Sequence, residues 1–407
     1  MVLLRKNAKD NIKMTESRIL YEKKLREHRR ALHMIPELDR ELPETRKYLL
    51  SVLQRLDCTI TPVCGDGLCA FFDKGMKDTF AFRADMDGLP IDEQNICGYA
   101  SVHSGRMHAC GHDGHMSMVL TLGEYINSAS SAEHNVLLIF QPAEETLGGA
   151  EEICRTGILK KYNVTRVFGI HLWPFIEKSH IASRPGAFMP RSAEVNIHVR
   201  GKAAHGTAPY EGLDALYIGA SIIRDIYMKH SERPGAIPHF SHNRGDLPKA
   251  PETPPEKRTL IHFGKMESGY ARNVVSDYSH ILGTVRAFCD EDFRQITDLI
   301  RQCAREAESV YGSPVEFTCS SGYPPVINDR ELYEKIRPVL DSLPSYTHME
   351  LPLMISEDFS FYGLFAPAVF FILGTGTGIP LHSSDFDFDE DILYAGLDLY
   401  LRLLRIG

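Results

Sequence analysis

The chain has 407 residues, of which 43% are hydrophobic and 24% charged, and its formal net charge is −9. This composition is typical of a soluble globular protein with about two domains. The acidic balance, without Lys/Arg clusters interleaved with aromatic residues, argues against a nucleic-acid partner. No apolar run approaches the ~20 residues that cross a bilayer, and the amino-terminal segment lacks the apolar core of a signal peptide. We therefore expect no membrane association, a cytoplasmic location and nine reduced cysteines.

The first half of the chain alternates predicted helices with short apolar strands. An amphipathic helix is expected to end before Pro36, and Pro43 suits the first turn of the next helix. The short apolar runs are typical of buried parallel strands. The predicted elements are helices at 17–34, 43–56 and 116–126, and strands at 68–72, 79–84, 136–140 and 167–170. This pattern predicts an α/β fold with a doubly wound, mostly parallel sheet.

The pattern changes near residue 186. The following elements are predicted as strand 193–200, helix 214–228, strands 260–264 and 278–287, helix 291–311 and strand 315–320. This β-α-β-β-α-β order is a complete α+β ferredoxin-like motif. We therefore expect an inserted domain at 187–322 within a first domain formed by 1–186 and 323–407. Residues 233–258, rich in Pro and His, are predicted to form a long exposed loop.

Residues that commonly bind metals occur in four loops at predicted strand ends. These residues are Cys110, His112, Glu144, Glu145, His171 and His382. The carboxyl ends of parallel strands meet at one edge of a sheet, where open α/β folds place their ligands. One thiolate, three imidazoles and one carboxylate would suit a pair of divalent ions, Zn²⁺ or Mn²⁺ and possibly Ni²⁺.

The adjacent pair Glu144 and Glu145 follows an apolar strand and a Gln-Pro-Ala turn. In an extended segment neighbouring side chains point in opposite directions, so one carboxylate could bind metal while the other faces a substrate. A two-metal hydrolase needs this division, because a free carboxylate must accept the proton of the attacking water. The alternative interpretation is a solvated acidic turn.

Five segments together resemble one protein family, the amidohydrolase branch of the aminoacylase and carboxypeptidase-type dinuclear metallopeptidases, which includes auxin-conjugate and hippurate hydrolases. The segments are Arg83–Asp87, Cys110–His115, Gln141–Glu145, Gly169–Pro174 and Pro380–Ser383. The resemblance implies that Glu144 is the general base and that Asp85 orients the ligand shell. It implies the metal ligands Cys110, His112, Glu145, His171 and His382.

The inserted domain resembles the lid and dimerisation domain of the same family. The match implies that His205 serves the site of a neighbouring subunit in a homodimer, and that Asn273 and Arg286 hold the substrate's carboxylate. From the residues alone, His205 would be an ordinary loop histidine and Arg286 a surface ion-pair partner. Segment 233–258 is longer than the family's usual connection, which bears on lid contacts and substrate preference.

The resemblance implies hydrolysis of N-acyl-L-amino acids to a carboxylic acid and a free amino acid by metal-activated water. A dipeptidase or carboxypeptidase of the same family is the alternative, since the same site could cleave any amide beside a free carboxylate. A Cys110 nucleophile with His112 or His115 as base would leave Glu144, His171 and His382 without a role. A degenerate, ligand-binding relative is disfavoured because every motif residue is present.

Overall fold

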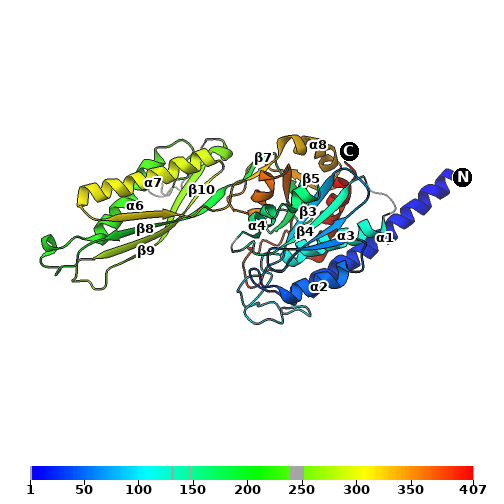
Figure 1. Cartoon of the computed structure of the whole chain (residues 1–407), viewed down its shortest axis with the longest axis horizontal. Helices are drawn as coiled ribbons and strands as arrows, with labels where there is room; N and C mark the ends of the chain where they lie inside the picture. The colour runs from blue at the N-terminus through cyan, green and yellow to red at the C-terminus, as the bar shows by residue number, and fades with distance from the viewer. Residues whose placement is uncertain (1, 130–132, 147, 239–251, 407) are drawn as a thin grey trace. The chain divides into compact units, whose positions relative to one another are not determined.

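The computed structural model describes residues 2–129, 133–146, 148–238 and 252–406, with side chains from residue 17 onward. The chain divides into two compact units (Figure 1). The first comprises Met1–Gly186, Ile327–Glu350 and Asp358–Gly407, and the second Ala187–Val326 and Leu351–Glu357. Strands β7 (Gly186–Met189) and β12 (Val326–Asn328), which form a two-stranded sheet, stand where the chain passes from one unit to the other. Residues 239–251 of the loop expected at 233–258 lie outside the described part of the chain.

The first unit is built on an eight-stranded sheet with the order β1-β2-β4-β3-β5-β14-β6-β13. The strands are β1 (Thr59–Val63), β2 (Gly67–Phe72), β3 (Thr79–Asp85), β4 (Asn135–Gln141), β5 (Val164–Trp173), β6 (Ile181–Ser183), β13 (Tyr346–His348) and β14 (Ala368–Gly374). The four central strands β4, β3, β5 and β14 are parallel to one another. Every residue of β3, β4 and β14 is buried, which explains the apolar runs in their sequences, and in β3 the buried residues include Arg83 and Asp85. The predicted α/β fold with a mostly parallel sheet is confirmed.

Helices pack on this sheet around one aromatic and aliphatic core. They are α1 (Val2–His33), α2 (Pro43–Leu53), α3 (His112–Ser128), α4 (Gly149–Arg155), α5 (Ile158–Lys161), α8 (Arg330–Asp341) and α9 (Leu393–Leu403), with the short 3₁₀ helices η3 (Asp358–Leu364) and η4 (Glu390–Ile392). Helix α3 packs between α1 and α9. Two predicted starts were wrong: α1 begins at Val2 rather than residue 17, and α3 begins at His112 rather than 116. Because Gly111 adopts φ +84° immediately before α3, the polar residues His112 and His115 fall on its first turn.

The second unit is a four-stranded antiparallel sheet packed against two helices. Its elements are β8 (Arg191–Arg200), η1 (Pro209–Glu211), α6 (Ala215–Ser231), η2 (Pro255–Lys257), β9 (Thr259–Ser268), β10 (Tyr278–Ala287), α7 (Asp290–Tyr311) and β11 (Val315–Cys319). The strand order β11-β8-β10-β9 is that of the predicted ferredoxin-like fold. Within the described residues, no helix is both long and apolar enough to cross a membrane.

Candidate metal centre

The predicted metal-binding residues of the first unit lie together at the carboxyl ends of its central strands. Asp85 ends β3 and is paired in register with Gln141, which ends β4, three residues before Glu144. His171 is on β5. Among the described residues of the first unit, potential ligand atoms lie within 4.8 Å of one another in three overlapping groups. The groups are Cys110, Glu145 and His382; His112, Glu144 and Glu145; and Asp85, His112, His115 and His171.

Backbone carbonyls fix which nitrogen of two imidazoles is available. His112 Nδ1 lies 2.7 Å from the carbonyl oxygen of Asp87, and His171 Nδ1 lies 2.7 Å from that of Leu172. A carbonyl can only accept a hydrogen bond, so each Nδ1 carries a proton and Nε2 is the nitrogen that can bind a metal. Burial lowers the pKa of His112, but Asp85 and Asp87 raise it to about 10, so a metal ion would displace a proton from His112 Nε2. His112 Nε2 is buried and makes no hydrogen bond within the described residues, with Asp85 Oδ2 at 3.7 Å and Glu145 Oε1 at 3.9 Å. Such gaps are close to the separation between two ligands of one ion.

The remaining donors converge on the same place. His171 Nε2 lies 3.4 Å from the Cys110 sulfur, and His382 Nε2 lies 3.1 Å from Glu145 Oε1. Burial raises the pKa of the Cys110 thiol, and Glu145, Glu144 and Asp85 raise it further. A thiolate surrounded by carboxylates requires a cation, so this donor set fits divalent metal ions.

The same electrostatics disfavour the alternative of a cysteine nucleophile. Burial lowers the pKa of His171, the imidazole beside the sulfur, to about 4. At neutral pH this imidazole is neutral and the thiol protonated, whereas an activated cysteine needs a thiolate stabilised by a cationic neighbour. Of the two bases expected for this alternative, His115 has both nitrogens engaged elsewhere, as described below. The other, His112, has a pKa raised to about 10, so this imidazole is already protonated at neutral pH and cannot accept the thiol proton.

Glu144 and Glu145 lie in a turn, so the expected extended segment was wrong. Ala143 has φ +59°, and the carboxylate of Asp87 accepts the backbone N–H groups of Glu144 (3.1 Å) and Glu145 (3.0 Å). One acidic side chain therefore fixes the backbone that presents both glutamates. The sequence contained a signal for this contact, since Asp87 lies in the same motif as Asp85, but no role was predicted for it.

Two side chains, His115 and Arg83, hold the carboxylate of Asp85 in place. His115 Nδ1 donates to its Oδ1 at 2.6 Å, and Arg83 Nη1 donates to its Oδ2 at 2.6 Å. His115 Nε2 accepts the N–H of Leu172 at 2.9 Å, so neither of its nitrogens is available to a metal. Burial raises the pKa of Asp85, but His112, His115 and Arg83 outweigh it and hold this pKa well below its usual value. Asp85 is therefore a buried anion beside His112.

A second buried acid, Asp358, joins the ends of β3 and β4. It accepts hydrogen bonds from Arg83 (2.7 Å), the side-chain amide of Gln141 (2.7 Å) and the backbone N–H of Ala150 (3.0 Å). Because Asp358 is distant in sequence from these partners, no local pattern could have predicted the contact. The network keeps Arg83 oriented toward Asp85.

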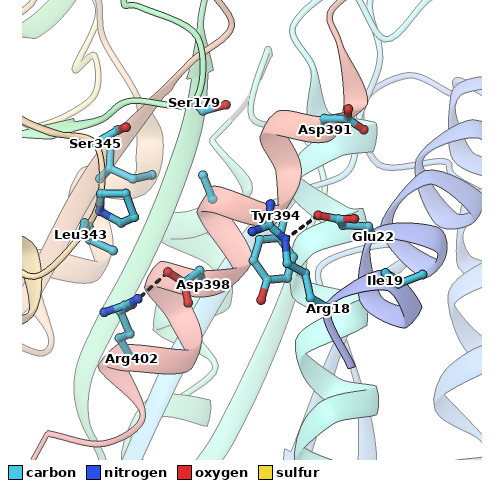
Figure 2. Close-up of a pocket in the computed structure, with 13 residues that line it drawn as sticks. Arg18, Ile19, Glu22, Ser179, Leu343, Ser345, Asp391, Tyr394, Asp398 and Arg402 are labelled. Carbon is cyan, nitrogen blue, oxygen red and sulfur yellow. Dashed lines mark hydrogen bonds and ion pairs between the residues drawn. The ribbon is translucent and has the colours of Figure 1, made fainter. Parts of the chain in front are cut away.

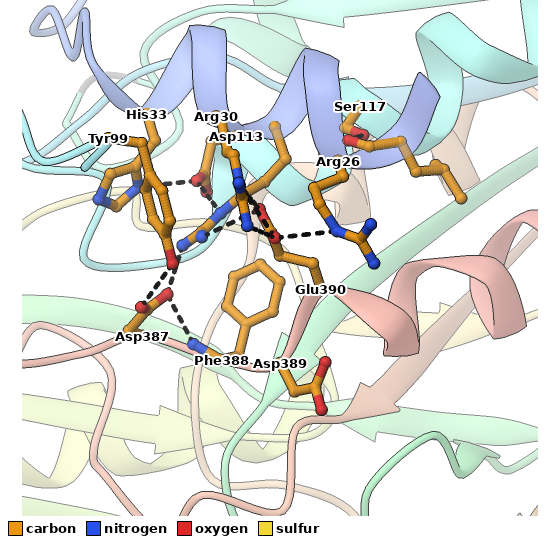
Figure 3. A network of polar contacts seen from close by, with 12 residues as sticks. Arg26, Arg30, His33, Tyr99, Asp113, Ser117, Asp387, Phe388, Asp389 and Glu390 are labelled. Atoms are coloured by element: carbon orange, nitrogen blue, oxygen red, sulfur yellow. Dashed lines mark hydrogen bonds and ion pairs between the residues drawn. The ribbon is translucent and has the colours of Figure 1, made fainter. Parts of the chain in front are cut away.

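An ionic network anchors the start of α3 (Figure 3). Asp113, next to His112, accepts from Arg29 Nε at 2.9 Å and His33 Nδ1 at 2.8 Å. Arg29 also donates to Asp387 Oδ1 at 2.6 Å, five residues after His382. The network thus connects α1 with the two segments that carry His112 and His382.

The second unit holds the other three predicted residues, at two separate places. An isolated β-bridge pairs His205 with Val274, and the N–H of Gly206 donates to the carbonyl of Asn273, so His205 and Asn273 lie together in an exposed loop region. Arg286, half-buried near the other end of β10, donates to the carbonyl oxygen of Met354. The eight steps along the strand from Tyr278 to Arg286 span about 26 Å. Asn273 and Arg286 of one chain therefore do not meet.

The first unit also has a surface pocket of about 780 Å³ that is separate from the metal centre (Figure 2). It is lined by residues of α1, α9 and the segment before β13, including Arg18, Tyr394 and Leu343. None of the predicted site residues is among its lining residues, so this pocket is distinct from the metal centre.

Comparison with known proteins identifies the family. Residues 81–406 match the model of peptidase family M20/M25/M40, and the chain belongs to this family. A hydrolase of uncharacterised specificity from Staphylococcus epidermidis is 32% identical over 388 residues, which cover 93% of this chain and 96% of the relative. The protein is accordingly a metal-dependent hydrolase.

Solved structures agree with this assignment. A candidate aminohydrolase from methicillin-resistant Staphylococcus aureus is 28% identical with a TM-score of 0.85, covering 98% of this chain and 100% of that one. A dinuclear metal-binding M20 peptidase from Bacillus subtilis is 26% identical with a TM-score of 0.79, covering 95% and 98%. An aminobenzoyl-glutamate utilisation protein from Klebsiella pneumoniae, 18% identical with a TM-score of 0.66 over 97% and 98%, shares the fold.

Proposed function

We propose that this protein hydrolyses N-acyl-L-amino acids to a carboxylic acid and a free amino acid. The observation that carries the proposal is the placement of the Glu144 carboxylate beside His112 and Glu145, within a cluster of potential metal ligands. A dipeptidase or carboxypeptidase activity is the alternative, because the same groups would act on a peptide bond beside a free carboxylate.

Cys110, His112, Glu145, His171 and His382 would hold two divalent ions, Zn²⁺ or Mn²⁺ and possibly Ni²⁺. When bound, the ions would acidify a water molecule and polarise the scissile carbonyl. Asp85, ionised and fixed by Arg83 and His115, would orient the ligand shell around His112.

Glu144 would act as the general base. Its carboxylate would accept a proton from the water as the water oxygen attacks the carbonyl carbon of the amide. It would then donate that proton to the amide nitrogen as the carbon–nitrogen bond breaks. The products are the carboxylic acid and the amine of the amino acid, and Glu144 returns to its ionised form.

The second unit would act as lid and dimerisation domain of a homodimer. Arg286 would bind the α-carboxylate of the substrate through charge-assisted hydrogen bonds after releasing the Met354 carbonyl. Since Asn273 lies with His205 and far from Arg286, we propose that His205 and Asn273 serve the site of the neighbouring subunit, where His205 would stabilise the oxyanion. All nine cysteines are unpaired, which supports the proposed cytoplasmic location.

Two conservative variants of neighbouring residues test the catalytic assignment. Glu144→Gln should retain both metal ions but lose about 10²–10⁴-fold in kcat, because an amide cannot accept the proton. Glu145→Gln should lose metal as well as activity. Metal content and kcat are measured on the same preparations, and equal metal depletion in the two variants would contradict the assigned roles.

A substrate series separates the two activities. Purified protein loaded with Zn²⁺ or Mn²⁺ is assayed with N-acetyl and N-benzoyl amino acids and with dipeptides of the same carboxyl-terminal residue. The proposal expects a higher kcat/KM for the acylated amino acids. A preference for dipeptides would replace it with the peptidase alternative.

A further inference from the structure

Two histidines of the second unit form a pair that the proposed reaction does not use. His198 on β8 and His280 on β10 are directly opposite each other in the antiparallel register. Their rings stack with centroids 3.9 Å apart and planes 16° apart. Helices α6 and α7 cover one face of this sheet (Figure 1). The alternate residues Ile197, Val199 and Ile281 are buried in the core on that face, so the two imidazoles project from the opposite face.

Acidic residues flank this pair in the same cross-strand row. Glu316 on β11 is opposite His198, and Glu267 on β9 is opposite His280. Glu267 forms an ion pair with Lys265 at 2.8 Å, whereas Glu316 has no ion pair within the described residues. The row borders a hollow of about 380 Å³ lined by both histidines and Glu316. One carboxylate is thus available next to the two imidazoles.

We propose that His198, His280 and Glu316 bind a divalent transition-metal ion, such as Zn²⁺, Cu²⁺ or Ni²⁺, on the open face of the second unit's sheet. Two imidazoles and one carboxylate are a donor set that such ions prefer. The imidazoles are stacked in nearly parallel planes, so binding a common ion requires the rings to rotate out of the stack and the Glu316 carboxylate to turn toward them. The site uses no residue of the metal centre in the first unit.

The polar surroundings leave these donors accessible. His198 makes no hydrogen bond in the part of the chain that the structure describes, and His280 makes one, from Nε2 to Asn196 Oδ1 at 3.3 Å. Burial and the neighbouring His198 lower the pKa of His280, so its imidazole is neutral at neutral pH and retains a lone pair. Arg200 also borders the hollow.

The bound ion would connect β8, β10 and β11 across the middle of the sheet. Backbone hydrogen bonds, the stacked imidazoles and the contact of His280 with Asn196 already join β8 and β10 at this point. A shared ion would add a link that also includes a side chain of β11. We therefore expect the ion to slow local opening of the sheet.

Zinc titration of the full-length protein tests the site. The protein is first loaded at the metal centre, and Zn²⁺ binding is then followed by calorimetry and by metal analysis after dialysis. Wild type should bind one further Zn²⁺ per subunit. His198→Ala and His280→Ala should lose this additional ion and keep the metals of the first unit, and Glu316→Gln should bind it at least about tenfold more weakly.

His262→Ala is the matched control, because His262 is an exposed histidine of the same sheet that faces Thr284 rather than a second imidazole. This variant should bind Zn²⁺ as wild type does. With Cu²⁺, the electron paramagnetic resonance spectrum of the additional ion should show coupling to two nitrogens. In a separate measurement, hydrogen exchange in β8 and β10 should slow on Zn²⁺ binding in wild type but not in His198→Ala. Unchanged stoichiometry in both histidine variants, or no additional ion in wild type, would overturn the proposal.

Discussion

The chemistry of the metal centre depends on which atom each side chain leaves free. The carbonyl oxygens of Asp87 and Leu172 accept hydrogen bonds from Nδ1 of His112 and His171, so Nε2 is the nitrogen that each ring presents to the donor cluster. His115 differs, because both of its nitrogens are hydrogen-bonded, to Asp85 and to the N–H of Leu172. Residue type alone does not distinguish a histidine that could bind a metal from one that supports the site. The hydrogen-bond partners of its two ring nitrogens make this distinction.

Replacing the thiol tests its role as a metal ligand. Cys110→Ser should weaken metal binding by at least about tenfold, because a hydroxyl is a harder and poorer donor at neutral pH than a thiolate. Metal affinity is measured by competition with a chelator. Cys69→Ser, at a buried cysteine of β2, is the control and should bind metal as wild type does. Full affinity and full activity in Cys110→Ser would show that the thiol is only a packing residue.

Arg286 gives a test of substrate recognition. Arg286→Ala should lower kcat/KM for N-acyl amino acids by about 10- to 100-fold, because a charge-assisted contact to the substrate's carboxylate is lost. Analogues with an amide in place of that carboxylate should be poor substrates of both proteins. The assignment fails if the variant still prefers the free carboxylate to the amide by the wild-type ratio.

At the scale of elements, the apolar strands were predicted well and the starts of two helices were not. Strand β10 has its predicted bounds, and the cores of β3, β4 and β14 follow their apolar runs. Helix α3 begins four residues early because Gly111 turns the chain and Asp113 is neutralised by Arg29 and His33, which come from α1. Such distant partners leave no trace in the local sequence.

In the candidate site too, some features could be predicted from the local sequence and others depend on distant partners. The motifs predicted which residues gather at the sheet edge, because parallel strand ends meet there. They did not predict that Asp87 caps the turn of Glu144 and Glu145, or that Asp358 links β3 to β4. These contacts join chain segments whose side chains can be related only after the sheet has formed.

The ionic network at the start of α3 predicts a pH dependence of stability. Burial lowers the pKa of His33, but Asp113 and Glu93 outweigh it and raise this pKa to about 9. In the unfolded chain the pKa is about 6.5. Between these values the folded state holds one more proton than the unfolded state, so stability is full below about pH 6.5 and falls as the pH rises toward 9.

Urea unfolding at a series of pH values checks this expectation. The wild-type midpoint should decrease between pH 6.5 and 9 more steeply than that of His33→Gln, which cannot be protonated. His262→Gln, at an exposed histidine, should follow the wild-type curve. Parallel curves for wild type and His33→Gln would show that the His33 charge does not stabilise the fold.

At the scale of the whole molecule, the separation of Asn273 from Arg286 on one chain requires explanation. Both match family segments that contact substrate, yet they lie near opposite ends of β10. The proposed two-fold dimer would resolve this, because each subunit could supply His205 and Asn273 to its partner's site while its own Arg286 serves its own site.

Complementation between inactive subunits tests this arrangement. His205→Ala and Glu144→Ala should each be nearly inactive alone. In a mixed dimer, the centre of the His205→Ala subunit keeps its own Glu144 and receives His205 from the partner, while the other centre carries both lesions. Random exchange makes half of the dimers mixed, so about a quarter of wild-type activity should return. If His205 acted within its own chain, every centre would keep one lesion, and samples shown to contain mixed dimers would stay inactive.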